Sequence, residues 1–167
     1  MFQRQINFVR QQGFESATAQ TCGVLYPALQ FQPRVIGAIL LVGVVAQPPV
    51  LFLALSAVLW WNVLVPRRNP FDRVYHRLIG IRRGHGPASP APPPRRFAQG
   101  LAATLTMFVG VSLLAGQILP AVVGEGILLA AIAAIVWRGF CLGSFIFHQL
   151  TRNAAFAKRT LPGGRGA

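Results

Sequence analysis

The alternation of apolar and polar stretches along the chain predicts two membrane hairpins separated by a basic connector. Residues 35–65 hold two apolar runs on either side of Gln47, Pro48 and Pro49. As one straight helix this stretch would be roughly 46 Å long, which exceeds the roughly 30 Å apolar thickness of a bilayer. We therefore expect a first hairpin over residues 35–65. Its first limb, residues 35–46, is short for a crossing, so it either thins the bilayer, extends backward beyond Pro33, or turns back partway.

A second hairpin is expected over residues 97–150. Residues 97–119 form the clearest crossing, because they make 23 consecutive positions without a charge. Residues 120–126 predict a tight turn, and residues 127–147 predict the returning helix. The pattern thus predicts an all-α polytopic membrane protein with four hydrophobic helical segments.

The connector, residues 66–96, is expected to carry an additional interfacial helix. Asn69, Pro70 and Asp72 form a strong helix start, with a cap, a proline at the first position and an acid in the first turn. Apolar positions then recur at the spacing of one helical face, at Phe71, Val74, Tyr75, Leu78 and Ile79. This helix should end near Gly80, and the proline-rich residues 84–94 should form a stiff spacer outside any packed core.

The two ends of the chain are polar. Residues 1–34 predict an amphipathic or irregular arm, with Phe2, Ile6 and Val9 on a face that could lie on the membrane. Pro27 and Pro33 are expected to break any long helix in this arm. Residues 151–167 predict a frayed basic tail.

Composition and charge agree with a membrane protein and predict its orientation. The chain of 167 residues is 53% hydrophobic and only 11% charged, whereas about a quarter of the residues of a soluble domain are charged. The net charge is +13, and all the cations except Arg138 lie in the arm, the connector and the tail, while both opposite turns lack them. Because Lys and Arg concentrate in cytoplasmic loops, both termini are expected to face the cytoplasm.

The connector contains eight arginines, half of all cationic residues. They stand beside apolar runs and not on a polar domain surface, which disfavours nucleic-acid binding. Anionic lipid is the favoured partner and an acidic protein the alternative. The candidate lipid- or partner-binding residues are Arg67, Arg68, Arg73, Arg77, Arg82 and Arg83.

Arg138 is a further candidate, because it is expected near the middle of the fourth apolar run. A guanidinium there costs about 2.5–3.5 kcal/mol on insertion scales. It would bind an anion, balance a bound cofactor or pair with another subunit. The alternative is a side chain that extends to the membrane surface without a further role.

The same run contains Gly139, Cys141 and Gly143. The two glycines make a G-x-x-x-G step, which allows close helix approach, most simply within the chain. Cys141 is either a small apolar filler or a redox or sulfur-carrying thiol. With Cys22 it makes only two cysteines, too few for a disulfide framework or a structural zinc site, and we expect no metal and no cofactor.

Two motifs resemble a known family. One is the string Arg96, Phe97, Ala98, Gln99 and Gly100; the other is Gly139, Phe140, Cys141, Leu142, Gly143 and Ser144. They resemble a family of small bacterial integral-membrane proteins catalogued only as a domain of unknown function, over about residues 22–150. This resemblance implies a multi-pass protein of the bacterial cytoplasmic membrane.

The family pattern has F-C-x-G-C at the fourth helix, and Ser144 replaces its second cysteine here. A dithiol pair can cycle to a disulfide, whereas Cys141 can form only mixed disulfides or bond to a distant thiol such as Cys22. The redox function that the cysteine pair implies is therefore weakened in this chain.

These observations leave three hypotheses for function. The favoured one is a non-catalytic accessory or scaffold subunit of a larger membrane assembly. Its partner would be another protein or further copies of the same chain. The chain has only three acidic residues and shows no phosphate loop or metal-spaced histidines. The alternatives are a thiol or sulfur-handling protein that uses Cys141 and, more weakly, a small-anion transporter that uses Arg138.

Overall fold

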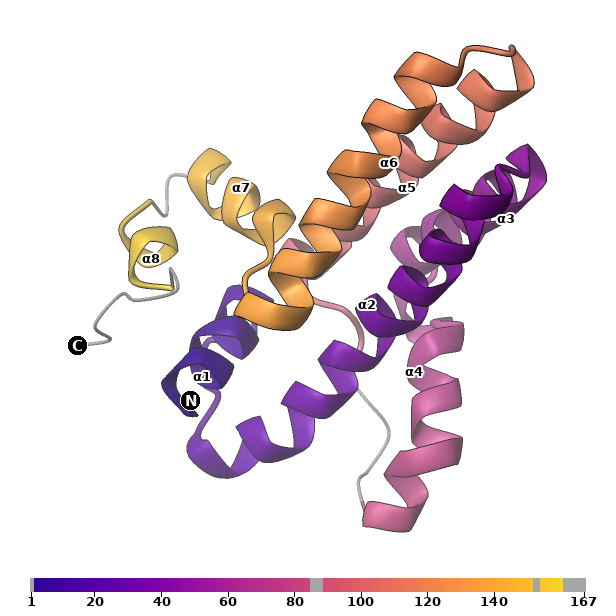
Figure 1. Ribbon diagram of the computed structural model, residues 1–167. Coiled ribbons are helices and arrows are strands. Elements are labelled where there is room, and N and C mark those ends of the chain that lie inside the picture. The colour runs from indigo at the N-terminus through magenta and orange to yellow at the C-terminus, as the bar shows by residue number, and fades with distance from the viewer. Residues whose placement is uncertain (1, 85–88, 152–153, 161–167) are drawn as a thin grey trace.

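The computed structural model describes residues 2–84, 89–151 and 154–160, and these residues form helices and no strand (Figure 1). Two helical hairpins make up the bundle. The first consists of α2 (Ala19–Ala46) and α3 (Pro49–Leu64), and the second of α5 (Pro93–Leu114) and α6 (Ile118–Ala133). The two hairpin turns lie at one end of the bundle, and α1, α7 and α8 gather at the other.

Three helices are long and apolar enough to cross a membrane, at Gln20–Ala46, Pro93–Leu114 and Ile118–Arg138. The fourth apolar helix, α3, has 16 residues and is about 24 Å long. Four crossings were expected. The structure supports three by length and adds one shorter apolar helix, which packs along α5.

Helix α2 differs from the expected irregular arm, because it runs unbroken for 28 residues with Pro27 and Pro33 inside it. The expectation that these prolines end the helix was wrong. Proline is tolerated in membrane helices, where neighbouring helices and local adjustments compensate for the lost backbone hydrogen bond. Thr18 caps α2 in a reciprocal capping box with Thr21. Of the three options for the first limb, the structure therefore has the backward extension beyond Pro33.

The turn of the second hairpin lies earlier than expected. It occupies Ala115–Gln117, where Gly116 adopts a φ of +70°, and α6 begins at Ile118. Residues 120–126, predicted as the turn, are helical. Pro120 fits in the first turn of α6 because the amide hydrogen it lacks would have no intrahelical partner there.

The fourth apolar run is not one helix. After α6 the chain continues through a wide helical turn, Ala134–Arg138, and then breaks at Gly139, which has a φ of +61°. A new helix, α7 (Leu142–Leu150), follows. Because Gly139 and Gly143 lie on either side of this break, they do not form a G-x-x-x-G face of one helix.

The amino-terminal arm is part of the packed structure. Helix α1 (Phe2–Gln11) buries Phe8 and Val9 in a core cluster that also contains Ala17, Cys22, Leu29 and Cys141. On the face that could have lain on the membrane, Val9 is therefore buried and Ile6 is half-buried by the chain itself. A larger core cluster, centred on Phe52, Leu59 and Val109, lies between the two hairpins.

The proline-rich spacer also joins the core at its end. Ala91 and Pro94 are buried, and a Cβ placed on Gly13 would lie 2.6 Å from the Pro92 Cβ. The spacer was expected to remain outside any packed core. This expectation was wrong for its second half. Residues 85–88 lie outside the described residues.

The connector helix begins as predicted. A short helical turn, Pro66–Arg68, leads to Asn69, whose Oδ1 accepts hydrogen bonds from the backbone N–H groups of Phe71 and Asp72. Helix α4 (Pro70–Tyr75) continues through wider and tighter turns, His76–Gly80 and Ile81–Arg83. Figure 1 shows this segment leaving the hairpins at the end where the termini lie. Helix α8 (Ala154–Arg159) is the described part of the basic tail.

Candidate functional site

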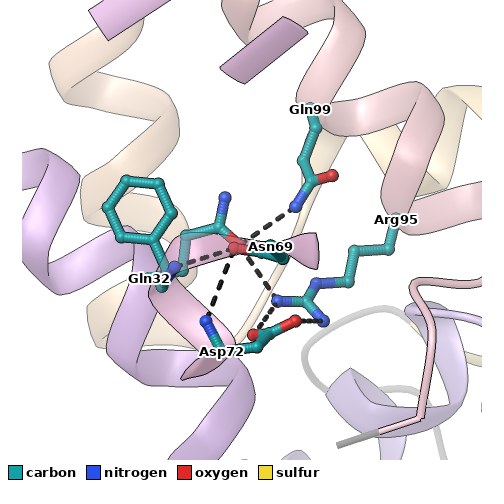
Figure 2. Close-up of polar contacts among 6 residues, drawn as sticks. Gln32, Asn69, Asp72, Arg95 and Gln99 are labelled. Carbon is teal, nitrogen blue, oxygen red and sulfur yellow. Dashed lines mark hydrogen bonds and ion pairs between the residues drawn. The ribbon is translucent and has the colours of Figure 1, made fainter. Parts of the chain in front are cut away.

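A buried polar cluster joins α2, α4 and α5 (Figure 2). At its centre, Arg95 makes a two-pronged ion pair with Asp72, with Nη2 2.8 Å from Oδ1 and Nη1 3.2 Å from Oδ2. The side chains of Arg95 and Asp72 are only 7% and 13% exposed. Paired, parallel hydrogen bonds of this kind are among the stronger polar contacts in proteins. This pair fixes the start of α5 to the start of α4.

Gln32 of α2 completes the cluster. Its Oε1 accepts hydrogen bonds from Asn69 Nδ2 at 3.3 Å, Arg95 Nη2 at 2.9 Å and Gln99 Nε2 at 3.0 Å. Figure 2 shows these donors converging on it from α4 and α5. Arg95 and Gln99 share one face of α5 because they are four residues apart. Three separate segments of the chain therefore meet at a single carbonyl oxygen.

One acceptor of the cluster is left over. Gln99 is 7% exposed, and its Oε1 has no hydrogen-bond partner within the part of the chain that the structure describes. A buried polar atom without a partner costs roughly 1–3 kcal/mol. The Gln99 Oε1 is therefore a buried acceptor without a donor among the described residues.

A cavity of about 590 Å³ lies beside this cluster, bounded by α2, α5, α6 and α7. It is partly open, and its size is within the roughly 300–1,000 Å³ of small-molecule sites. Gln12, Gln32, Arg95 and Gln99 contribute polar groups. Most of the remaining wall is apolar and includes Ile36, Leu105, Phe108, Ile127, Leu128 and Ile132. The cavity thus has the form of an apolar slot with polar groups from the polar cluster.

Cys141 lines the same cavity from the start of α7. It is 4% exposed, and its Sγ accepts a hydrogen bond from Ser144 Oγ at 3.4 Å. Its backbone N–H donates to Gln11 Oε1 at 2.9 Å. The Nε2 of that Gln11 amide is buried and lacks a partner among the described residues. The Cys141 thiol therefore lies beside the Ser144 hydroxyl. The Gln11 side chain, which binds the Cys141 backbone through its oxygen, has a nitrogen without a partner in the described part of the chain.

Cys141 and Ser144 are held against the start of α5. Ser144 Oγ lies 3.3 Å from the Pro94 carbonyl oxygen. A Cβ added to Gly143 would lie 2.7 Å from Ala98 Cα, so α7 approaches the α5 backbone very closely. His148 Nε2, one helical turn beyond Ser144, lies 3.1 Å from the Gln11 carbonyl oxygen. The thiol and the polar cluster consequently lie at the same end of α5.

The arginines predicted to bind lipid or a partner lie on the surface. All six are exposed, and they are Arg67, Arg68, Arg73, Arg77, Arg82 and Arg83. Asp72, the single acid of the connector, is bound to the buried Arg95. Asp72 is therefore not available to neutralise the charge of the exposed arginines.

Arg138 does not lie at the middle of a helix as expected. It is exposed and forms the last residue of the wide turn before Gly139. A cation at a helix C-terminus is favoured by the helix dipole. The premise of an arginine within a continuous crossing was wrong, because the positive φ of Gly139 ends the helix there.

The sequence did not single out Gln11, Gln32 or Glu125, and it gave Gln99 only as part of the family motif. Glu125 is buried in α6, where both of its carboxylate oxygens lie 3.0 Å from Gln47 Nε2. The available signal was the presence of polar residues inside apolar runs, and for Arg95 and Gln99 their spacing of four. Among the described residues there is no group of three or more His, Cys, Asp or Glu side chains that could hold a metal ion.

One comparison with known proteins gives a match. A family described as a domain of unknown function (DUF4395) matches residues 26–152. The match includes Gln32, the ion pair, the cavity helices and Cys141. No curated protein and no solved structure matches the chain.

Proposed function

The chain belongs to the family described as a domain of unknown function (DUF4395). From this premise we propose that it is a non-catalytic accessory subunit of a membrane assembly and that it binds a lipid-like amphiphile. The observation that carries the proposal is the 590 Å³ cavity, which combines apolar walls with the buried polar cluster. An amphiphile with one long apolar chain and a hydroxyl or amine head matches this arrangement. The head would donate to the Gln99 Oε1 that lacks a partner.

The position of the cavity supports a ligand taken from the bilayer. Its walls come mainly from α2, α5 and α6, which contain the three segments long enough to cross a membrane. The cavity is partly open, and an opening between these helices would admit a lipid-like molecule directly from the bilayer. The polar cluster then sets the position of the head, and the chain lies along the apolar wall.

The distribution of acids supports a binding role over acid–base catalysis. The chain has three acidic residues. Asp72 is bound to Arg95, Glu125 is bound to Gln47, and Glu15 is exposed on the segment between α1 and α2. None of the three lines the cavity. A bound molecule would therefore meet amides, a guanidinium and a thiol, but no carboxylate.

A photoreactive long-chain alcohol tests the proposal. Purified protein in detergent is irradiated with the probe, and the labelled peptides are identified by mass spectrometry. We expect labels on the α5 and α6 residues of the cavity wall. Ala131→Phe, which fills the cavity, should abolish the labelling, whereas Ala130→Phe, on the exposed side of the same helix, should preserve it. Equal labelling of both variants would reject the proposed site.

The contribution of Gln99 can be separated from that of the apolar wall. Gln99→Leu should weaken competition by a long-chain alcohol about tenfold, as the loss of one hydrogen bond of about 1.4 kcal/mol predicts. Competition by an alkane of the same length should change little. Unchanged competition by the alcohol would show that Gln99 does not contact the head.

The arginine surface supports an anchoring role for the same subunit. We propose anionic lipid headgroups as its partner, because Val74, Leu78 and Ile81 are exposed on the same segment as the arginines. Apolar residues beside arginines suit the boundary between headgroups and acyl chains. Anionic lipid retained by the purified protein should decrease when the six arginines are replaced by glutamine, and unchanged lipid content would favour an acidic protein partner.

A thiol function at Cys141 is the second candidate. The observation that favours it is the position of the thiol on the cavity wall, with a hydroxyl donor from Ser144. Loss of cellular function in Cys141→Ser, with Cys22→Ser unaffected, would support it. Anion transport through Arg138 is not carried forward, because this residue is exposed at a helix end.

A further inference from the structure

The two cysteines differ in their access to the cavity. Both are free and buried, and both belong to the core cluster around Phe8 and Val9. Cys141 lines the cavity, whereas Cys22 is not part of its wall. A molecule bound in the cavity therefore lies against Cys141 and not against Cys22.

The surroundings of Cys141 contain an unused hydrogen-bond donor. Gln11 is 0% exposed; its Oε1 accepts from the Cys141 backbone N–H, and its Nε2 has no partner within the described ranges. Ser144 Oγ lies 3.4 Å from the sulfur and 3.3 Å from the Pro94 carbonyl oxygen, so these two acceptors share its single hydroxyl proton. A carbonyl group attached to the sulfur would add an oxygen acceptor to the residue whose backbone N–H already binds the Gln11 amide. The site thus has a nucleophile, the Cys141 sulfur. A hydrogen-bond donor for an acyl carbonyl, Nε2, belongs to Gln11, the residue bound to the Cys141 backbone.

The direction of the cavity fits an attached chain. Gly143 packs on Ala98 and Ser144 bonds to Pro94, so Cys141 lies near the start of α5. The apolar wall continues along α5 through Leu101, Leu105 and Phe108. A chain that begins at the sulfur would accordingly run along α5 with apolar contacts on its sides.

We propose that Cys141 carries a long-chain acyl group as a thioester and that the cavity houses the chain. This inference rests on the proposed function, since it places an acyl chain against the apolar wall of the same cavity. An acyl thioester has no hydroxyl or amine, so it does not use the Gln99 Oε1. The donor is a long-chain acyl thioester of the acyl-coenzyme A class. The Cys141 sulfur attacks its carbonyl carbon, a new S–C bond forms, and the S–C bond of the donor breaks. The thiol proton leaves with the donor's sulfur, and no oxidant or reductant takes part.

Metabolic labelling with an alkynyl fatty acid tests the inference on the full-length protein in its own membrane. We expect wild type and Cys22→Ser to take up the label, Cys141→Ser to lose it, and neutral hydroxylamine to release it. Ala131→Phe should lower the labelling while leaving the thiol in place, and Ala130→Phe should not. Label that persists in Cys141→Ser, or that resists hydroxylamine, would overturn the proposal.

Peptide mapping tests the acylation of Cys141 on the wild-type protein, so the result does not depend on whether a variant folds. Trypsin cleaves after Arg138 and Arg152, so the peptide 139–152 contains Cys141, and Cys22 lies in a different peptide. We expect the acyl mass on the peptide 139–152 from the wild-type protein. A wild-type peptide found only with a free thiol would also overturn the proposal.

The photoreactive alcohol distinguishes failure of this inference from failure of the proposed function. If the alcohol labels the cavity wall but Cys141 carries no acyl group, the cavity binds an amphiphile without a covalent bond, and only the present inference fails. If the alcohol does not label the wall and Cys141 is not acylated, both proposals fail. In a fully acylated protein the alcohol should label the wall only after hydroxylamine treatment.

Discussion

At the scale of single residues, the pair of Arg95 and Asp72 joins the start of α4 to the start of α5. Both side chains are largely buried, and Arg95 also donates to Gln32. A buried charge pair contributes little net stability compared with an apolar pair, but removal of one partner leaves an uncompensated charge. The pair therefore fixes the position of α4, and the loss of either side chain should destabilise the protein.

We predict that Asp72→Asn lowers the unfolding free energy by about 3–5 kcal/mol, the usual cost of breaking a buried ion pair. Thermal unfolding of the purified protein in detergent measures this loss. Adding Arg95→Met to Asp72→Asn should recover part of it, because no unpaired guanidinium remains. Arg73→Gln, at an exposed neighbouring position, is the control and should leave the unfolding temperature unchanged. An Asp72→Asn protein as stable as wild type would show that water or lipid headgroups reach Arg95.

A second residue pair joins the two hairpins at the end of their turns. Glu125 is 2% exposed, and Gln47 Nε2 donates to both of its carboxylate oxygens. Gln47 lies in the α2–α3 turn and adopts a φ of +51°, while Glu125 belongs to α6. The pair thus links a turn of the first hairpin to a helix of the second.

Gln47→Leu should destabilise the protein by about 1–3 kcal/mol, because it leaves a buried carboxylate without its donor. Glu125→Gln should cost less, since a neutral amide is easier to bury than a carboxylate. Gln117→Leu, at an exposed position in the other hairpin turn, is the matched control. Unfolding temperatures in detergent rank the three variants. If Glu125→Gln proves the most harmful, the carboxylate has a role beyond this contact.

At the scale of helices, the sequence predicts those features that depend on local chemistry. The Asn69 cap and the start of α4 are confirmed, because the side chain and the N–H groups it binds are close neighbours in the chain. The hairpin turn at Ala115–Gln117 was missed. Pro120 and Gly126 appeared to mark a turn, but a proline in the first turn of a helix is equally favourable.

Features that depend on distant residues were not predictable in the same way. Gln32, Asn69, Asp72, Arg95 and Gln99 meet only because α2, α4 and α5 pack together. No local pattern indicates which polar residue inside an apolar run will face another. The persistence of α2 through Pro27 and Pro33 has the same origin, since helices gain most of their stability from the packing of neighbours.

The contact between α7 and α5 controls how closely Cys141 is covered. A Cβ on Gly143 would lie 2.7 Å from both Cα and Cβ of Ala98, and Ala98 Cα is part of the backbone and cannot rotate away. Gly143→Val should therefore push α7 off α5. We predict that, after neutral hydroxylamine has released any thioester, a membrane-permeant maleimide alkylates Cys141 several-fold faster in this variant than in wild type. Gly126→Val is the control, because a Cβ there meets nothing within 4 Å. Unchanged alkylation would mean that α7 moves as a unit with α5 and keeps the thiol covered.

At the scale of the whole molecule, the charges and the helices together define two ends. The exposed arginines, α1 and α8 lie at one end of the bundle, and the two hairpin turns lie at the other. Cations are absent from both turns in the sequence. The acids reinforce the asymmetry, because Glu125 lies near the turns and Asp72 is bound by Arg95.

This asymmetry predicts the orientation of the protein in the membrane. Because segments rich in arginine are retained in the cytoplasm, the turn at Ala115–Gln117 should face the opposite side. Single cysteines introduced by Ala115→Cys and Arg82→Cys test this in whole cells, since both positions are exposed whereas Cys22 and Cys141 are buried. A membrane-impermeant maleimide should label position 115 in intact cells and position 82 only after permeabilisation. The reverse pattern would place the arginines outside the cytoplasm, and with them the end of the bundle where Cys141 lies, away from an acyl-coenzyme A donor in the cytoplasm. The orientation experiment therefore also tests the acylation of Cys141 by a route independent of the label.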